Sequence, residues 1–141
     1  MRAAYQFLRE GEIVSGGGTI TMQVARNYVL TKERTFERKL KEIFTALKID
    51  LNYSKEEIFE LYVNQIFLGN RAYGIKAAAE IYYDKALEDL TLEQYAMIAA
   101  LPKAPSRINP LVNPRKAIIR RNYVLRRMLA LEFINQGEYE K

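Results

Sequence analysis

Apolar residues recur every three to four positions along much of the chain, the spacing that places side chains on one face of an α-helix. Clear stripes run through three segments, 36–51, 55–67 and 116 onward. Their members are Leu40, Ile43, Phe44, Leu47 and Leu51; then Ile58, Leu61, Tyr62 and Ile66; and last Ala117, Arg121, Val124, Leu125 and Met128. We expect the first two helices to bury these faces, and the third to be long and basic. Because no convincing strand alternation, internal repeat or low-complexity tract appears, the sequence predicts one all-α unit over residues 1–141.

Local signals mark where several helices begin. The segments 54–57 and 91–94 carry Ser-Lys-Glu-Glu and Thr-Leu-Glu-Gln, which are typical capping boxes. Asn113 followed by Pro114 indicates an N-cap and a first helical residue. All four prolines lie in residues 102–114, which predicts an irregular connection, and the small residues of 72–83 favour close helix packing in a core.

Composition limits the chemistry that the chain can perform. With 141 residues and 49% hydrophobic content it is large enough to bury a core, and it contains neither cysteine nor histidine. Thiolate chemistry is therefore excluded, and acid–base catalysis would depend on carboxylates, lysine or tyrosine. No run of about 18 apolar residues predicts a transmembrane helix. The net charge of +5 is divided into basic ends (residues 1–48 and 96–141) and an acidic middle, which suggests a polyanionic partner.

A glycine turn, Gly16-Gly17-Gly18, leads directly into the polar and cationic segment 19–27. The first turn of a helix has backbone N–H groups without internal partners, and glycines let a ligand approach them closely. An anion such as phosphate would suit this position. By itself, however, a run of glycines before a helix is more often a plain turn.

A second run of cationic residues lies one helix further along the chain, and a glutamate follows it. These residues are Arg34, Arg38, Lys39, Lys41 and Glu42. If a helix begins near Thr35, Arg38 and Glu42 are one turn apart, opposite the apolar stripe. Spacing alone favours a solvated surface ion pair. The functional alternative is a carboxylate held among cations that neutralise a pyrophosphate leaving group.

The ordered set of these motifs resembles the transglycosylase domain of the class A penicillin-binding proteins, the peptidoglycan glycosyltransferases. Gly17 through Gln23 is similar to the second of that family's five motifs, and Arg38 through Glu42 to the third. The fourth and fifth are matched by Lys55–Ile58, Glu60, Tyr62, Asn64 and Gly69, and by Arg121, Val124, Leu125 and Met128. The segments 71–74, 77–79 and 101–105 are also familiar from these proteins. The resemblance implies a lysozyme-like helical fold.

Two departures from the family pattern stand out. Gly18 occupies a position where relatives usually carry serine. The family's first motif, with the glutamate taken to be the general base, would lie upstream of Met1. We therefore expect an incomplete glycosyltransferase domain that is inactive by itself.

The resemblance also implies the reaction and the residues that serve it. The 4-hydroxyl of lipid II would attack the anomeric carbon of a growing glycan strand, with inversion and loss of undecaprenyl pyrophosphate. Glu42 would be the catalytic carboxylate, orienting the donor phosphate or holding a divalent cation such as magnesium. The residues implied to bind substrate are Thr19, Gln23, Arg26, Arg34, Arg38, Lys39, Lys41 and Asn64. A scaffolding role is at least as reasonable for Tyr62, Asn64, Arg121 and Met128, because their helices carry clear core stripes.

The implied partners are lipid II, the glycan strand, a membrane surface and the inhibitor moenomycin, with no nucleic acid. The implied location is the outer, periplasmic face of the bacterial inner (cytoplasmic) membrane, with an anchor outside this chain. Apolar residues that could meet lipid are Tyr5, Phe7, Leu8, Ile13, Tyr28, Val29 and Leu30, although core burial explains them equally well. One alternative function is a helical module that binds nucleic acid or an anionic surface through residues 115–127. Another is a domain that folds and binds nothing.

Overall fold

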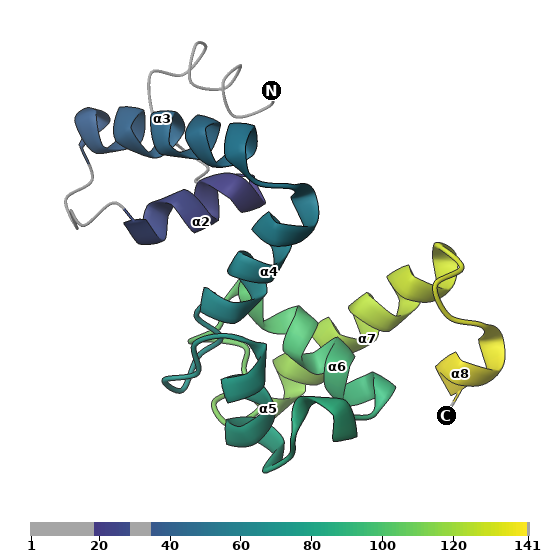
Figure 1. The fold of residues 1–141 in the computed structure, drawn as a ribbon. Helices are drawn as coiled ribbons and strands as arrows, with labels where there is room; N and C mark the ends of the chain where they lie inside the picture. The colour runs from purple at the N-terminus through teal and green to yellow at the C-terminus, as the bar shows by residue number, and fades with distance from the viewer. Residues whose placement is uncertain (1–18, 29–34, 141) are drawn as a thin grey trace, which may run out of the picture. The chain divides into compact units, whose positions relative to one another are not determined.

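The computed structural model describes residues 19–28 and 35–140, and these residues are helical apart from turns and one isolated antiparallel bridge. They form two compact units, one ending at Tyr62 and the other beginning at Val63. Each unit is described by itself below (Figure 1). The expected all-α fold class is confirmed.

The first unit is built from α2 (Ile20–Tyr28), α3 (Phe36–Asn52) and most of α4 (Lys55–Gln65). In Figure 1, α2 lies alongside α3. Val24 and Ala25 of α2 are fully buried, in one cluster with Ala46 and Ile49 of α3 and Ile58 of α4. Because two of these five side chains are alanines, the helix backbones approach closely at this contact.

The apolar stripe of α3 corrects the expectation that this face is buried. Its five members are exposed: Leu40 (40%), Ile43 (39%), Phe44 (64%), Leu47 (52%) and Leu51 (84%). The buried residues of α3 are instead Glu42, Ala46 and Ile49. Periodicity identified an amphipathic helix correctly, but α2 packs against the side of the helix that carries small and charged residues. The stripe therefore faces away from the core of its unit.

The second unit contains α5 (Ile75–Tyr83), α6 (Leu92–Ala100), α7 (Pro114–Ala130) and α8 (Gln136–Glu140), with short 3₁₀ turns η1 (Leu87–Asp89) and η2 (Leu101–Lys103). Its main core joins Leu68, Ala72, Ala78 and Ala79 to Leu101. The prediction that the small residues of 72–83 pack in a core is thus confirmed. A second cluster, with Leu125 of α7 against Ala96 of α6, fixes those two helices to each other.

The predicted helix starts are confirmed by their hydrogen bonds. Glu57 N donates to Ser54 Oγ at 3.2 Å while Ser54 N donates to the Glu57 carboxylate at 2.8 Å. Thr91 forms the second capping box, and Asn113 Oδ1 accepts from Lys116 N at 3.2 Å before Pro114. A further box between Asn135 and Glu138, which begins α8, was missed.

The proline-rich segment is irregular, as predicted, and a glycine fits tightly against it. Gly69 has a φ of +87°, and a Cβ there would lie 2.3 Å from the carbonyl oxygen of Pro105. Asn109, which is buried, donates to that same carbonyl at 2.7 Å. Only glycine combines this backbone conformation with this approach. The loop is therefore part of the packed unit.

Asp50 connects the three helices of the first unit. Its Oδ1 accepts from the hydroxyl of Thr21 on α2 at 3.0 Å and from the ammonium group of Lys55 on α4 at 2.9 Å. Both hydrogen bonds lower the pKa of Asp50 below its usual value, and the one from Lys55 has the larger effect. Asp50 thus ties the start of α2 to the end of α3 and the start of α4.

This connection predicts a pH dependence of stability. A carboxylate whose folded-state pKa is lowered stabilises the fold above its unfolded pKa, and the contribution is lost as the pH falls through the folded value. We expect the free energy of unfolding to decrease as the pH falls below about 4, the ordinary pKa of an aspartate, and to decrease less in Asp50→Asn. Urea unfolding followed by circular dichroism at a series of pH values measures both slopes. Equal slopes for the two proteins would contradict this assignment.

Candidate functional site

The candidate site begins at the first turn of α2. Thr19 precedes the helix, its hydroxyl accepts from Met22 N at 3.2 Å, and its carbonyl accepts from Gln23 N at 3.0 Å. The segment that follows the glycine turn therefore begins a helix directly after Thr19. Gly16, Gly17 and Gly18 lie outside the described residues, so the anion site expected at the glycine turn stays a prediction.

The start of α3 is fixed in the same way. Thr35 is the N-cap, and its side chain accepts from Arg38 N at 3.2 Å. This contact places Arg38 and Lys39 in the first turn of α3, and Glu42 one turn further along the same side. Spacing had suggested a helix that begins near Thr35, and the hydrogen bond confirms it.

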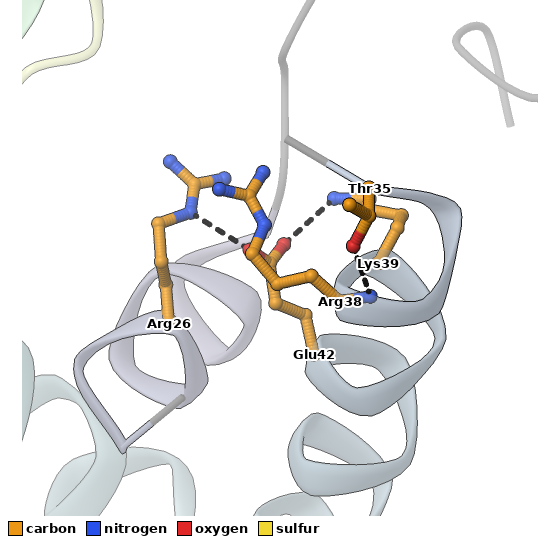
Figure 2. Close-up of polar contacts among 5 residues, drawn as sticks. All are labelled: Arg26, Thr35, Arg38, Lys39 and Glu42. Carbon is orange, nitrogen blue, oxygen red and sulfur yellow. Dashed lines mark hydrogen bonds and ion pairs between the residues drawn. The ribbon is translucent and has the colours of Figure 1, made fainter. Parts of the chain in front are cut away.

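Glu42 lies at the centre of the site, with no exposed surface. Its Oε1 is 3.5 Å from Arg26 Nε and 3.3 Å from Arg38 Nε, and its Oε2 accepts from Lys39 Nζ at 3.1 Å. Figure 2 shows the two guanidinium groups side by side over the carboxylate, one from each helix. A single buried carboxylate is therefore surrounded by three cations.

The charges within this cluster do not cancel. One negative and three positive side chains leave about two positive charges, and the side chain of Arg26 is 46% exposed. Each arginine approaches the carboxylate through Nε, which leaves the two terminal nitrogens of each guanidinium group pointing elsewhere (Figure 2). Arginine forks match the oxygens of carboxylates and phosphates. The net charge of the cluster therefore favours an anionic ligand, and a doubly charged anion would neutralise it.

This burial corrects the interpretation favoured by spacing alone. The Arg38–Glu42 pair was expected to be a solvated contact between two surface side chains, but Glu42 is fully enclosed and Arg38 is only 21% exposed. α2 covers the pair and adds Arg26 from a segment 16 positions away. Spacing within one helix could not reveal that contact.

The other predicted site residues are placed as follows. Lys41 turns away from Glu42 and pairs with Glu37 at 2.7 Å, where both side chains are largely exposed. Gln23 is half-buried on α2, and Asn64 is exposed on the part of α4 that belongs to the second unit. Arg34 lies outside the described residues, as do Tyr5, Phe7, Leu8, Ile13, Val29 and Leu30. The substrate-binding roles stay predictions.

The donor chemistry around Glu42 does not fit magnesium. That ion requires several oxygen ligands, usually including more than one carboxylate or phosphate. Within the described ranges, no group of three acidic side chains could hold a metal ion, and the neighbours of Glu42 are cations. No step of the function proposed below uses a metal.

Comparison with known proteins decides the family. The family model described as "Transglycosylase" matches residues 1–129. The chain belongs to the transglycosylase family. It is 61% identical to penicillin-binding protein 1A of Pseudomonas aeruginosa over 99% of its length, and 49% identical to that of Escherichia coli over 99%. It covers only 17% and 16% of those two proteins.

A solved structure agrees with the transglycosylase assignment. The crystal structure of penicillin-binding protein 1A from Haemophilus influenzae matches 84% of this chain with a TM-score of 0.60 and 41% identity. The chain covers 15% of that protein. The predicted resemblance and fold class are confirmed, and nothing in these comparisons favours the nucleic-acid alternative.

Tyr62, a residue of the fourth motif, packs against the buried cluster of the first unit. This burial raises the pKa of its hydroxyl group. Both observations agree with a scaffolding role.

Removal of the central charge should destabilise this transglycosylase domain. In Glu42→Gln the three cations lose their shared counter-charge, so we expect the free energy of unfolding to fall by about 2 kcal/mol. Chemical denaturation measures the change. Glu37→Gln is the matched control, because it alters an exposed pair on the same helix and should have little effect. If both variants lost the same stability, the buried cluster would not be a special feature of the fold.

Proposed function

We propose that this domain takes part in polymerising lipid II into glycan strands, and that the Arg26–Arg38–Lys39 cluster binds the pyrophosphate of the departing undecaprenyl group. The observation that carries the proposal is the excess of positive charge around buried Glu42. As the anomeric C–O bond breaks, negative charge builds up on the leaving pyrophosphate. Preorganised cations stabilise that charge without having to reorganise during the reaction.

The cations have complementary geometries in this proposal. Arg26 and Arg38 would present the ends of their guanidinium forks to the phosphate oxygens, and Lys39 would contribute a compact charge beside them. Thr19 and Gln23 on α2 are the neighbouring candidates for polar contacts with substrate. In this proposal the described residues stabilise the leaving group, and no general base is assigned among them.

Glu42 acts as a positioning residue in this proposal. It has no exposed surface, so it is placed to hold its partners rather than to touch substrate. Three cations placed within reach of one phosphate would repel one another if no carboxylate lay between them. Glu42 offsets this repulsion in the free protein while leaving the cluster net positive.

The exposed stripe of α3 supports a membrane surface as the partner. Phe44, Leu47 and Leu51 are each more than half exposed, on the helix whose other side carries Glu42. An apolar helix face enters the headgroup region of a bilayer when its opposite face is polar or packed against protein. Within the described ranges, no helix is long and apolar enough to cross a bilayer. We place the domain at the outer face of the cytoplasmic membrane, where the lipid-linked substrate would be reached without leaving the bilayer.

The basic helix α7 offers weaker support for nucleic-acid binding. Arg120 stacks on the ring of Tyr123 at 4.4 Å, and Arg121 donates to Asn122 through two nitrogens. Two of the helix's cations are therefore engaged within the helix itself. The family assignment favours the transferase.

The cation cluster predicts a loss of anion affinity when either arginine is neutralised. We expect Arg26→Gln and Arg38→Gln each to weaken the binding of inorganic pyrophosphate and of moenomycin by about tenfold, because each removes a charge-assisted contact. Isothermal titration calorimetry measures the dissociation constants. Lys48→Gln is the matched control, since Lys48 is an exposed cation elsewhere on α3. Unchanged affinity in both arginine variants would overturn the proposed pyrophosphate site.

The apolar stripe predicts membrane association. Phe44→Ser combined with Leu47→Ser should reduce partitioning onto vesicles of phosphatidylethanolamine and phosphatidylglycerol at least about tenfold, because two large apolar side chains no longer enter the lipid. Vesicle sedimentation in high salt isolates this apolar contribution. Ile118→Ser with Ile119→Ser removes two exposed apolar side chains from α7 and should have little effect. Equal loss in both double variants would show that general surface hydrophobicity, rather than α3, drives association.

A further inference from the structure

A short hairpin in the second unit, residues 66–74, has a feature that the reaction described above does not use. Phe67 and Tyr73 form an isolated antiparallel bridge, and Leu68 N donates to the Ala72 carbonyl at 2.9 Å. Gly74 N closes the base of the hairpin, away from the turn, by donating to Ile66 O at 2.8 Å. The chain reverses direction over Gly69, Asn70 and Arg71.

The hairpin is held firmly both beside its turn and at its base. Leu68 and Ala72 are buried in the core of the unit, and the hydroxyl of Tyr82 donates to Leu68 O at 2.9 Å. Gly74 lies so close to Asn64 that a Cβ would be 2.4 Å from the Asn64 carbonyl oxygen. The tip is therefore presented on a fixed support, next to a residue predicted to bind substrate.

The tip itself adopts a conformation that its residues disfavour. Asn70 and Arg71 have φ values of +45° and +64°. Asparagine tolerates the left-handed region, but this conformation is strained for arginine, and glycine would adopt it with less strain. Non-glycine residues held in such conformations concentrate at functional positions, where the side chain is needed. The exposed arginine at this position thus points to a role for its guanidinium group.

The side chains at the hairpin combine aromatic and planar polar surfaces. The rings of Phe67 and Tyr73 are 5.1 Å apart with planes tilted by 46°, and Tyr73 is 64% exposed. The turn between these two aromatic residues carries Asn70, with an amide, and Arg71, with a guanidinium group, and both residues are exposed. A pyranose ring has an apolar C–H face that packs on an aromatic ring, and a rim of hydroxyl and acetamido groups that takes hydrogen bonds from planar donors.

We propose that this hairpin is a second saccharide-binding surface, which holds an N-acetylamino sugar of the glycan strand through the Tyr73 ring and the Arg71 and Asn70 side chains. A lipid surface fits less well, because the aliphatic side chains of the segment, Ile66 and Leu68, are half-buried or buried while its tip is polar. Asn64, which is exposed, has its backbone next to Gly74 at the base of the hairpin. This inference rests on the proposed function, since it assumes that a glycan is the polymer handled.

Titration of the 15N-labelled 141-residue chain with a tetramer of N-acetylglucosamine tests it by nuclear magnetic resonance. We expect concentration-dependent shifts of the amides of residues 66–74 and of Asn64. Tyr73→Ala should weaken binding about five- to tenfold, the range expected for loss of one aromatic contact. Tyr123→Ala is the control, because it removes an exposed tyrosine that also has an arginine neighbour, Arg120, on a regular helix.

Arg71→Gly separates binding from folding. Glycine suits a φ of +64°, so this variant should unfold at the same temperature as the parent or a higher one, yet bind the tetramer at least about fivefold more weakly. Arg71→Lys keeps a cationic donor and should recover part of the affinity. A purely structural role for Arg71 would leave affinity unchanged in both variants.

Two results would overturn the inference: no shifts in residues 66–74, or shifts that persist unchanged in Tyr73→Ala and Arg71→Gly. Titration of the same samples with inorganic pyrophosphate distinguishes this failure from that of the proposed function. If pyrophosphate binds through Arg26 and Arg38 while the tetramer does not bind the hairpin, only the saccharide surface is wrong. If pyrophosphate also fails to bind, the proposed pyrophosphate site fails with it.

Discussion

The first unit of this domain depends on one buried carboxylate. Glu42 on α3 is enclosed by Arg26 from α2 and by Arg38 and Lys39 from its own helix. A charge without solvent contact is tolerated only when it is paired, and the cations need the carboxylate in turn because they repel one another. Packing of α2 on α3 and assembly of a positive surface are therefore the same event. The contact that buries Glu42 between α2 and α3 is also the contact that assembles the net positive cluster.

The same constraint explains why α3 has two unlike faces. A helix that encloses Glu42 must turn Ala46 and Ile49 toward α2, so its large apolar side chains face outward. In a protein surrounded only by water this arrangement would expose an unusually continuous apolar stripe. In the function proposed above, the same arrangement would place the cations that bind pyrophosphate and the side chains that meet lipid on one helix, as a lipid-linked pyrophosphate requires. The proposed anion site, the proposed membrane contact and the packing of the first unit would then all depend on α3.

The second unit is stabilised by apolar packing and close backbone contacts rather than by a buried charge cluster. Its core is formed by alanines and leucines at close helix contacts, and its turns are fixed where glycine backbones approach carbonyl groups, as at Gly69 and Gly74. A scaffold of this kind leaves little freedom at the hairpin between those two glycines. Strain at Arg71 persists because the surrounding contacts determine the backbone there. Binding surfaces can then be presented on rigid supports rather than on loose loops.

The sequence by itself determined the local features of this protein. Capping boxes at Ser54 and Thr91, the N-cap at Asn113 and the helical periods follow from interactions between residues a few positions apart. The ordered motifs also determined the family, because their residue types and spacing are specific. Tertiary structure decided which helix face became buried and which charges met. Arg26 reaches Glu42 across 16 positions, and Lys41 leaves the cluster although it is adjacent in sequence. The periodicity of the sequence shows that a helix has an apolar and a polar face. Which of the two faces is buried depends on the element that packs against the helix.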